Sequence, residues 1–284
     1  MTLDDHVPMS FEEFRLLNGL LQAHCGIVYP IESKYLFSRR LLPRLAELGL
    51  GSFTDYYRHL RYADRGRLEL DELCDRVTTN ETYFFREPRQ LDALAEEILP
   101  DVHDRAPRGR RLSIWSAGCA TGEEAYTVAI IVLETGLFGD WEVRVFGSDV
   151  SRRVLHTARW ATYGRSSFRA TDERTVRRWF RPHDGRQRVR EEVRALCSFG
   201  HVNLLDEGML ALVGEVDIIL CRNVIMYFDM PARRRALANL HRRLVPGGYL
   251  LLGHSESLIN ASTAFELAHL KRELVYRKPP TGAP

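Results

Sequence analysis

The stretch from Leu112 to Ala129 reads LSIWSAGCATGEEAYTVA and decides the fold of this chain. A short apolar run ends in a turn of small residues, and the turn opens directly into a helical pattern. The run from Glu142 to Asp149, EVRVFGSD, repeats the strand pattern and ends in an acid. A glycine turn after one strand and a carboxylate at the tip of the next are typical of open α/β sheets that bind a nucleoside. The acid can accept hydrogen bonds from both ribose hydroxyls.

The residues of the turn narrow the class of ligand. A dinucleotide site would read GxGxxG, whereas Gly118 and Gly122 have no third glycine in register. A phosphate loop would continue with Lys and Ser or Thr, but Gly122 is followed by Glu123 and Glu124. Two carboxylates would repel a pyrophosphate and would suit an ammonium or a sulfonium, both of which S-adenosylmethionine carries. The alternative is that the two glutamates only complement the helix dipole.

Composition is that of an ordinary globular protein. The 284 residues allow one large domain or two modest ones, and the net charge of +2 argues against a dedicated nucleic-acid binder. The five cysteines are scattered without a CxxC pair, which predicts neither a metal site nor a disulfide framework and fits a reducing cytosol. Because no apolar leader and no run of about 18 apolar residues occurs, we expect a cytoplasmic protein without membrane insertion.

The first hundred residues predict helices. A capping box at Ser10–Glu13 begins the first helix. Further patterns of helical period cover Lys34–Leu48, Phe53–Tyr62 and Leu68–Val77. We therefore expect an all-α domain at residues 1–78. Residues 79–106 would then form a linker and a helix that begins at Pro88.

Residues 107–284 predict an α/β domain with a Rossmann-like sheet. Its expected strands are Leu112–Ala117, Val143–Gly147, Asp217–Cys221 and Tyr249–Leu252, with an antiparallel pair inside Glu266–Arg277. The alternation of strands and helices fails at about residues 163–202, where Asp184–Gly185 is a hairpin signal. We expect a small antiparallel β-subdomain to be inserted there.

Three further motifs complete the pattern. TTNETYFFRE (Thr78–Glu87) precedes the α/β domain, VNLL (Val202–Leu205) ends the inserted region, and CRNVIMYF (Cys221–Phe228) follows a central strand. Together with the glycine turn and FGSD, they resemble the CheR family of chemotaxis protein-glutamate O-methyltransferases. The resemblance runs from about Ser10 to Lys278 and so covers nearly the whole chain.

The resemblance implies a monomeric enzyme with a Rossmann-like methyltransferase sheet. Such an enzyme transfers a methyl group from S-adenosylmethionine to glutamate side chains in the cytoplasmic helical bundle of chemoreceptors, and S-adenosylhomocysteine is the second product. The all-α domain would recognise the receptor. Some family members are tethered to a receptor pentapeptide by a loop of the β-subdomain. The matching loop, Arg181–Arg186, is short, so we expect a tether-independent enzyme.

The resemblance also implies roles for individual residues. The expected cofactor-binding residues are Asn80, Thr82, Arg86, Gly118, Glu123, Asp149, Asn203, Leu204, Arg222 and Asn223. Among them, Glu123 would hold the methionyl group and Asp149 the ribose. Asn203 and the backbone of Leu204 would read the adenine edge. The expected catalytic residues are Arg86, which steers the substrate carboxylate, and Tyr227, which stands near the methyl group.

Several of these residues have a plainer alternative. Asn80 and Thr82 can be a helix cap and a turn, and Asp149 can be the N-cap of a helix near Ser151. Arg86 can be a surface arginine, and Tyr227 can be a core aromatic, as we expect for Phe228. The GHSES run (Gly253–Ser257) resembles a hydrolase elbow, but its fifth residue is not glycine and no strand-to-helix turn follows, so we discard that function.

A basic helix face is the candidate surface for the receptor. Between Ser33 and Arg67, positive residues exceed negative ones by five. We expect Arg39, Arg40 and Arg44 to contact an acidic receptor bundle. The alternative is a solvated helix face.

Two other functions stay open at this point. The first is methylation of an amine. Such enzymes often carry Asn/Asp-Pro-Pro-Tyr, and Asn223–Tyr227 lacks both prolines. The second is a non-catalytic sensor that binds S-adenosylmethionine.

The chemistry expected for glutamate methylation is simple. A glutamate carboxylate, with a reference pKa near 4.3, is ionised at neutral pH and needs no general base.

Overall fold

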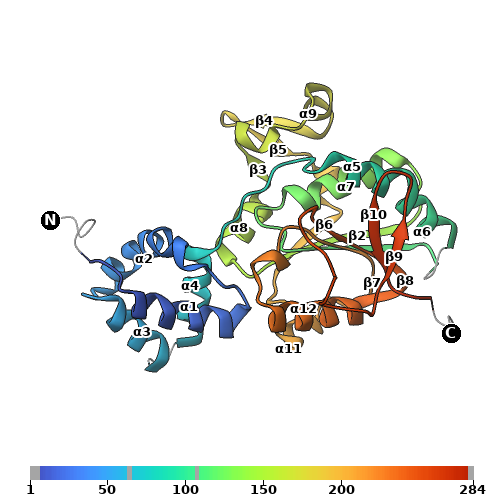
Figure 1. Ribbon diagram of the computed structural model, residues 1–284. Coiled ribbons are helices and arrows are strands. Elements are labelled where there is room, and N and C mark those ends of the chain that lie inside the picture. Colours follow the sequence, from blue (N-terminus) through green and yellow to red (C-terminus); the bar gives the residue numbers. More distant parts are fainter. Residues whose placement is uncertain (1–6, 63–65, 106–108, 281–284) are drawn as a thin grey trace.

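The computed structural model describes residues 7–62, 66–105 and 109–280. The expected break at Pro107 and the expected domain boundary at 106/107 lie outside the described residues, as do Asp64 and Arg65 of the basic segment and the side chain of Arg67. Figure 1 shows a helical domain on the left, joined by an extended linker to a sheet flanked by helices. A small antiparallel sheet lies above the main one in this view.

The N-terminal helices confirm the pattern expected from the sequence. They are α1 (Phe11–Cys25), α2 (Lys34–Leu48), α3 (Phe53–Tyr62) and α4 (Gly66–Val77), with a short 3-10 turn at Ile31–Ser33 before α2. The capping box is present, because Ser10 accepts the Glu13 amide and the Glu13 carboxylate accepts the Ser10 amide. The apolar stripe of α1 buries Phe14, Leu17 and Leu21 completely or nearly so.

The end of α1 packs directly on the α/β domain. Gly26 follows α1 in the left-handed region, at φ 79°. A Cβ there would come within 2.8 Å of Ala232 and 2.9 Å of Leu205, so only glycine permits this approach. One continuous apolar core therefore runs from the N-terminal helices to one face of the sheet.

A seven-stranded mixed sheet forms the centre of the described chain, in the order β6-β2-β1-β7-β8-β10-β9. The parallel strands are β6 (Cys197–His201), β2 (Glu142–Asp149), β1 (Arg111–Ala117), β7 (Val216–Cys221) and β8 (Leu244–Leu252). The antiparallel edge pair is β10 (Leu274–Arg277) and β9 (Glu266–His269), as the sequence predicts. The expected Rossmann-like sheet is confirmed.

Helices cover both faces of this sheet. The helices α5 (Pro88–Ala93) and α6 (Leu99–Arg105) are continuous through a π-helical turn at Leu94–Ile98. The remaining long helices are α7 (Glu123–Thr135), α8 (Arg152–Trp160) and α12 (Met230–Arg243). Leu112 and Ile114 of β1 belong to the core that contains α7, whereas Trp115 and Ala117 belong to the core that contains α12. Both faces of the central strand are therefore buried.

The expected antiparallel subdomain is present, but it is shorter than the sequence indicates. It contains β3 (Thr162–Tyr163), a 3-10 turn (Arg165–Phe168), α9 (Glu173–Trp179), β4 (Phe180–His183) and β5 (Arg186–Val189). The short α10 (Glu191–Arg194) then leads to β6, which pairs in parallel with β2. The expected range of 163–202 is therefore wrong at its end, because β6 belongs to the main sheet and its short half-buried run lacks a βα signature.

No helix within the described residues is long and apolar enough to cross a membrane.

Candidate active site

A pocket opens where the strands β1, β2, β6 and β7 end, at the carboxyl edge of the sheet. It encloses about 1060 Å³ of atom-free space, including its open mouth. Its walls come from the end of α1, the linker before α5, the glycine turn and the loops after β2, β6 and β7. Ten of the eleven residues that the sequence singles out for cofactor or catalysis line it, namely Asn80, Thr82, Arg86, Gly118, Asp149, Asn203, Leu204, Arg222, Asn223 and Tyr227.

The glycine turn is held against β2 by its own backbone. The amides of Gly118 and Cys119 both donate to the carbonyl of Ser148, at 2.7 and 2.8 Å. Gly118 has a φ of 86°, and a Cβ there would overlap the side chain of Val224. The turn is therefore a cradle in which the backbone itself can approach a ligand.

Asp149 lies at the tip of β2 with both carboxylate oxygens fixed. One oxygen accepts the amide of Ala120 at 2.9 Å, and the other accepts the amide of Ser151 at 2.9 Å. Burial raises the pKa of this carboxyl to about 6, although the two amides oppose the shift. The N-cap of α8 is Ser151, whose side chain accepts the amide of Val154, so Asp149 is not that cap. Its remaining acceptor capacity faces the pocket.

The two adjacent glutamates of the turn point in different directions. The carboxylate of Glu123 accepts the hydroxyls of Thr121 at 2.6 Å and Ser167 at 3.0 Å, and it is absent from the described lining of the pocket. Glu124 does line the pocket, so of these two glutamates the structure brings Glu124, and not the expected Glu123, to the described cavity. Consecutive residues at a helix start are about 100° apart, and only one of the two can face the sheet edge. Glu123 instead ties α7 to the β-subdomain.

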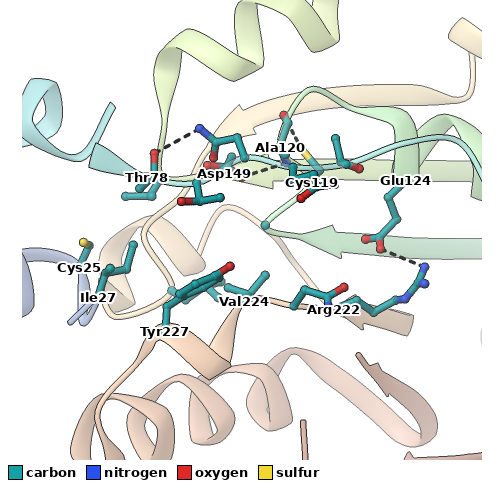
Figure 2. Close-up of a pocket in the computed structure, with 18 of the residues that line it drawn as sticks. Cys25, Ile27, Thr78, Cys119, Ala120, Glu124, Asp149, Arg222, Val224 and Tyr227 are labelled. Carbon is teal, nitrogen blue, oxygen red and sulfur yellow. Dashed lines mark hydrogen bonds and ion pairs between the residues drawn. The ribbon is translucent and has the colours of Figure 1, made fainter. Parts of the chain in front are cut away.

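Glu124 and Arg222 form a buried pair in the floor of the pocket (Figure 2). The guanidinium of Arg222 lies 3.2 Å from Glu124 and 3.1 Å from Glu87, and it donates to the carbonyl of Arg86 at 2.6 Å. Glu124 also accepts the hydroxyl of Ser116 at 2.7 Å. Burial raises the pKa of Glu124, and the positive charge of Arg222 opposes that shift. Arg222 therefore holds the linker down over the sheet edge as well as lining the pocket.

The linker is anchored by its aromatic residues. The ring of Phe84 is fully buried and contacts the rings of Tyr163, Phe168 and Phe180 at centroid distances of 4.8–5.1 Å. Arg86 follows with one hydrogen bond, from its guanidinium to the carbonyl of Glu81 at 3.0 Å. Packing of Phe84 in the subdomain thus leaves the half-buried Arg86 at the pocket.

The earlier part of the linker turns its polar side chains to the same cavity. The amide of Asn80 donates to the hydroxyl of Thr78 at 3.3 Å, and both residues line the pocket together with Thr82. Residues 78–83 have no helical structure, so Asn80 and Thr82 are not a helix cap.

The loop after β6 is fixed by α1 and α12. The side chain of Asn203 donates to the carbonyl of His24 at 2.6 Å and accepts the amide of Leu205 at 2.9 Å. The carbonyl of Leu204 accepts the buried side chain of Asn239 at 2.7 Å. This arrangement leaves the amide of Leu204, rather than its carbonyl, as the backbone group that can face a base.

Tyr227 closes the pocket from the opposite side. In Figure 2 its ring lies across the cavity from Asp149 and Ala120. Its carbonyl accepts the amide of Val28 at 2.9 Å, which joins the loop after β7 to the end of the helical domain. Tyr227 is half-buried against the apolar core and also lines the pocket, whereas Phe228 is buried at 8% exposure, as expected.

Some lining residues are not foreseeable from the sequence. Cys25, Ile27 and Tyr29 come from the helical domain and complete one wall of the pocket. They belong to no recognisable motif, because they reach the site only through the packing of α1 against α12. Glu124 and Val224 belong to motifs that the sequence does identify, but their orientation is set by the fold.

The three arginines expected to meet the receptor differ in their surroundings. Arg39 is exposed, with its guanidinium 5.9 Å from the ring centre of Tyr35. Arg40 donates to the carbonyl of Val77 and to the hydroxyl of Thr79 at 3.3 Å. Arg44 forms two hydrogen bonds with the buried carboxylate of Glu69, at 2.9 and 2.6 Å, and one with Glu47. Arg40 and Arg44 therefore have partners inside the chain and stabilise the helical domain and the start of the linker, whereas Arg39 is exposed.

The pocket has the chemistry that S-adenosylmethionine requires. A backbone cradle at Gly118 would overlap any side chain, and Asp149 offers paired acceptors for a ribose. Glu124 offers a buried negative charge for an ammonium group, and Tyr227 supplies an aromatic wall. These residues fit the cofactor, and they would not fit a pyrophosphate.

Comparison with known proteins shows which family the chain resembles. Residues 80–274 match the family model of the CheR methyltransferase SAM-binding domain, and residues 12–78 match that of the CheR all-alpha domain. The chain is 34% identical to the chemotaxis protein methyltransferase of Vibrio parahaemolyticus, over 95% of this chain and 98% of that protein. It is 35% identical to the chemotaxis protein methyltransferase of Klebsiella aerogenes, over 95% of this chain and 90% of that protein.

Among solved structures, an O-methyltransferase family protein from Burkholderia thailandensis aligns with a TM-score of 0.41 and 14% identity, over 89% of this chain and 72% of that one. The two family models together extend over most of the chain, and the curated relatives match nearly end to end. The chain therefore belongs to the CheR methyltransferase family and is an S-adenosylmethionine-dependent protein-glutamate methyltransferase.

Proposed function

We propose that the pocket at the carboxyl edge of the sheet is the methyl-transfer centre and that its substrates are glutamates in the cytoplasmic helical bundle of chemoreceptors. The observation that carries this proposal is the enclosure of one cavity by Asp149, Glu124, Arg86 and Tyr227, which come from four separate segments. Residues 1–78 would recognise the receptor, residues 79–106 would cover the cofactor, and residues 107–284 would carry the reaction.

The cofactor-binding residues would act as follows. Asp149 accepts hydrogen bonds from the ribose, and Glu124 pairs with the ammonium group of the methionyl portion. Asn203 and the amide of Leu204 contact the adenine edge, while Asn80, Thr82, Arg222 and Asn223 line the remaining surface. This set replaces Glu123, which supports the β-subdomain, with Glu124.

When bound, S-adenosylmethionine supplies a sulfonium methyl group that a carboxylate oxygen can accept directly. The substrate glutamate is already ionised at neutral pH, so no residue of this chain has to remove a proton. The protein must orient one carboxylate oxygen towards the methyl group and exclude water. Orientation of this kind contributes on the order of 7–11 kcal/mol at most.

Arg86 suits the steering of a substrate carboxylate. One of its nitrogens is held by the carbonyl of Glu81, and its other donors are not taken by a carboxylate in the described structure. A full bidentate pair would lower the reactivity of the substrate carboxylate, so a single contact during approach fits the reaction better. Tyr227 would shape the channel on the other side and donate a hydrogen bond.

Receptor docking would use the exposed side of α2, where Arg39 is the exposed one of the three expected arginines. The β4–β5 hairpin turns through Asp184 and Gly185 alone, and this short loop supports a tether-independent enzyme. We also propose a cytoplasmic location, because the proposed substrate, the helical bundle of the chemoreceptor, is cytoplasmic.

The test is methyl transfer to receptors in vitro. The full-length protein is incubated with labelled S-adenosylmethionine and purified chemoreceptor cytoplasmic fragments, and the labelled peptides are mapped. Label on glutamates that alkali releases as methanol supports the proposal. Alkali-stable label would indicate amine methylation, and binding of S-adenosylmethionine without transfer would indicate a sensor. Either result would overturn the proposed substrate.

A further inference from the structure

The loop after β7 carries a large share of the pocket but has little regular structure of its own. Asn223, Val224 and Tyr227 line the cavity, and a single 3-10 turn spans Ile225–Tyr227. Asn223 has a φ of 59°, in the left-handed region that residues other than glycine adopt uncommonly and asparagine more often than most. Such a loop needs outside partners for its backbone amides, because an unpaired amide costs free energy when it is buried.

One carboxylate supplies those partners. Glu256 accepts the amide of Asn223 at 2.7 Å through one oxygen, and the amides of Val224 and Met226 at 2.9 and 3.0 Å through the other. The first oxygen also accepts the amide of Gly253 at 2.8 Å. Hydrogen bonds to an ionised acceptor are about twice as strong as those between neutral groups. Glu256 therefore fixes the backbone of the loop after β7 at three points, and its bond to Gly253 holds its own loop.

Glu256 belongs to the GHSES run that follows β8, the strand beside β7. The two loops approach as closely as the backbone allows. A Cβ on Gly253 would come within 2.7 Å of the side-chain nitrogen of Asn223 and 2.9 Å of its amide nitrogen. Asn223 is thus enclosed between Gly253 and the carboxylate of Glu256. The GHSES run, considered from the sequence only as a hydrolase elbow, therefore supports the loop after β7.

We call the hydrogen bonds of Glu256 to the amides of Asn223, Val224, Met226 and Gly253 the Glu256 clamp. This clamp also affects the glycine turn. Val224 packs on Gly118 so closely that no side chain fits between them. Fixing the amide of Val224 therefore also fixes the wall that faces the turn. Glu256 itself is absent from the described lining of the pocket, so it acts through its neighbours rather than on a ligand.

We propose that Glu256 is a positioning residue for methyl transfer, whose carboxylate sets the backbone of residues 223–226 and thereby the place of Asn223 and Tyr227. The assignment rests on the proposed role of the pocket. A carboxylate is required, because a glutamine at this position has one acceptor oxygen and turns its amino group towards two backbone donors.

The test compares Glu256→Gln with Glu266→Gln, a matched change at an exposed position on the edge strand β9. For Glu256→Gln we expect the affinity for S-adenosylhomocysteine to fall at least about 10-fold and kcat to fall about 10–100-fold, since a small misplacement can cost that much. The KM for the receptor should stay within about 2-fold, because the helical domain is unchanged. Glu266→Gln should leave all three quantities unchanged.

A double-mutant cycle separates positioning from general stability. If Glu256 acts through the loop, its effect on S-adenosylhomocysteine affinity is strongly non-additive with that of Asn223→Ala. Glu256→Asp, which restores the charge on a shorter side chain, should recover part of kcat. A Glu256→Gln protein with a lower Tm but normal kcat and affinity, or additive effects in the cycle, would overturn the assignment. If the Gln variant does not fold, Glu256→Asp is put through the same cycle, with the same criteria.

Failure of this inference is distinguishable from failure of the proposed function. The affinity for S-adenosylhomocysteine is measured by calorimetry without any receptor, so it reports on the clamp even if the receptor fragments are not methylated. Absence of transfer by the wild-type protein contradicts the proposed substrate, whereas unchanged affinity in Glu256→Gln contradicts the clamp.

Discussion

The guanidinium of Arg222 lies 3.2 Å from the carboxylate of Glu124, and the arginine side chain is only 2% exposed. The same guanidinium lies 3.1 Å from Glu87, so one arginine pairs with two carboxylates beside the cavity. A buried charge without its partner is costly, so this pair couples the stability of the chain to the geometry of the pocket.

Replacement of Arg222 by methionine should therefore destabilise the protein. The change keeps most of the volume but leaves Glu124 and Glu87 without their positive partner, which costs about 3–5 kcal/mol. Chemical denaturation gives the free energy of unfolding. Arg111→Met is the matched control, because Arg111 pairs with Glu142 on the surface and such pairs contribute about 0–1 kcal/mol. Equal denaturation midpoints for Arg222→Met and the wild type would refute this account.

Replacement of Asp149 by alanine should weaken cofactor binding. The change removes the acceptor proposed for the ribose hydroxyls and also frees the amides of Ala120 and Ser151. We expect the affinity for S-adenosylmethionine to fall by roughly 2–4 kcal/mol. Calorimetry on the folded variant measures this loss directly. An unchanged affinity would exclude Asp149 as the ribose partner.

Cofactor binding should weaken at acidic pH. Burial raises the pKa of Asp149 to about 6, so its carboxylate is ionised above that pH and becomes protonated as the pH falls through it. Protonation converts an acceptor into a donor, so the affinity for S-adenosylmethionine should be flat above about pH 7 and decline below about pH 6. Burial also raises the pKa of Glu124, which acts in the same direction. Asp149→Asn isolates the contribution of Asp149, because the affinity of this variant should decline less as the pH falls. If the variant and the wild type show the same dependence of affinity on pH, the assignment is contradicted.

Replacement of Arg86 by alanine should affect turnover more than folding. Its guanidinium makes one hydrogen bond, to the carbonyl of Glu81, and is half exposed to the pocket. We expect the Tm to change little and methyl transfer to fall at least about 100-fold, as when a positioning contact is lost. Arg169→Ala, which removes a neighbouring arginine that pairs with Glu81, should have a much smaller effect on turnover. Near-normal transfer by Arg86→Ala would remove this residue from the mechanism.

Receptor docking should depend on Arg39 and not on Arg44. Arg39→Ala should raise the KM for the receptor and weaken its salt dependence, while the Tm and cofactor affinity stay unchanged. Arg44→Ala should instead lower the stability by about 1–3 kcal/mol, because among the described residues it leaves the hydroxyl of Tyr56 as the remaining donor to the buried carboxylate of Glu69. Receptor kinetics at low salt and thermal denaturation separate the two effects. If Arg39→Ala shows wild-type kinetics, the β4–β5 hairpin is the next surface to test.

The sequence predicts regular elements well where the local pattern is strong. The helices Lys34–Leu48 and Phe53–Tyr62 are found at their expected bounds, and the Asp184–Gly185 signal does form a hairpin. The strand β6 is different, because its half-buried run from Cys197 to His201 shows no clear period. Its place in the main sheet is decided by pairing with β2, a contact between distant parts of the chain.

The motifs similarly identify the segments of the site but not the orientation of each side chain. Glu123 and Glu124 are adjacent in the sequence. Only the fold shows that Ser167 donates a hydrogen bond to Glu123, whereas Arg222 pairs with Glu124. Likewise, the basic pattern of α2 gives no sign that Arg44 pairs with Glu69, which lies 25 residues further along the chain.

By itself, the sequence of this protein determined the class of fold, the carboxyl edge of the sheet at which the pocket opens, and the class of cofactor. Those properties depend on residue types at short spacing, such as the turn from Gly118 to Gly122 and the acid at Asp149. Only the tertiary structure decided which glutamate faces the cavity, that Cys25 and Ile27 complete its wall, and that Glu256 holds the loop of Asn223. These relationships join residues that are far apart in the chain, and no local pattern encodes the packing that brings them together.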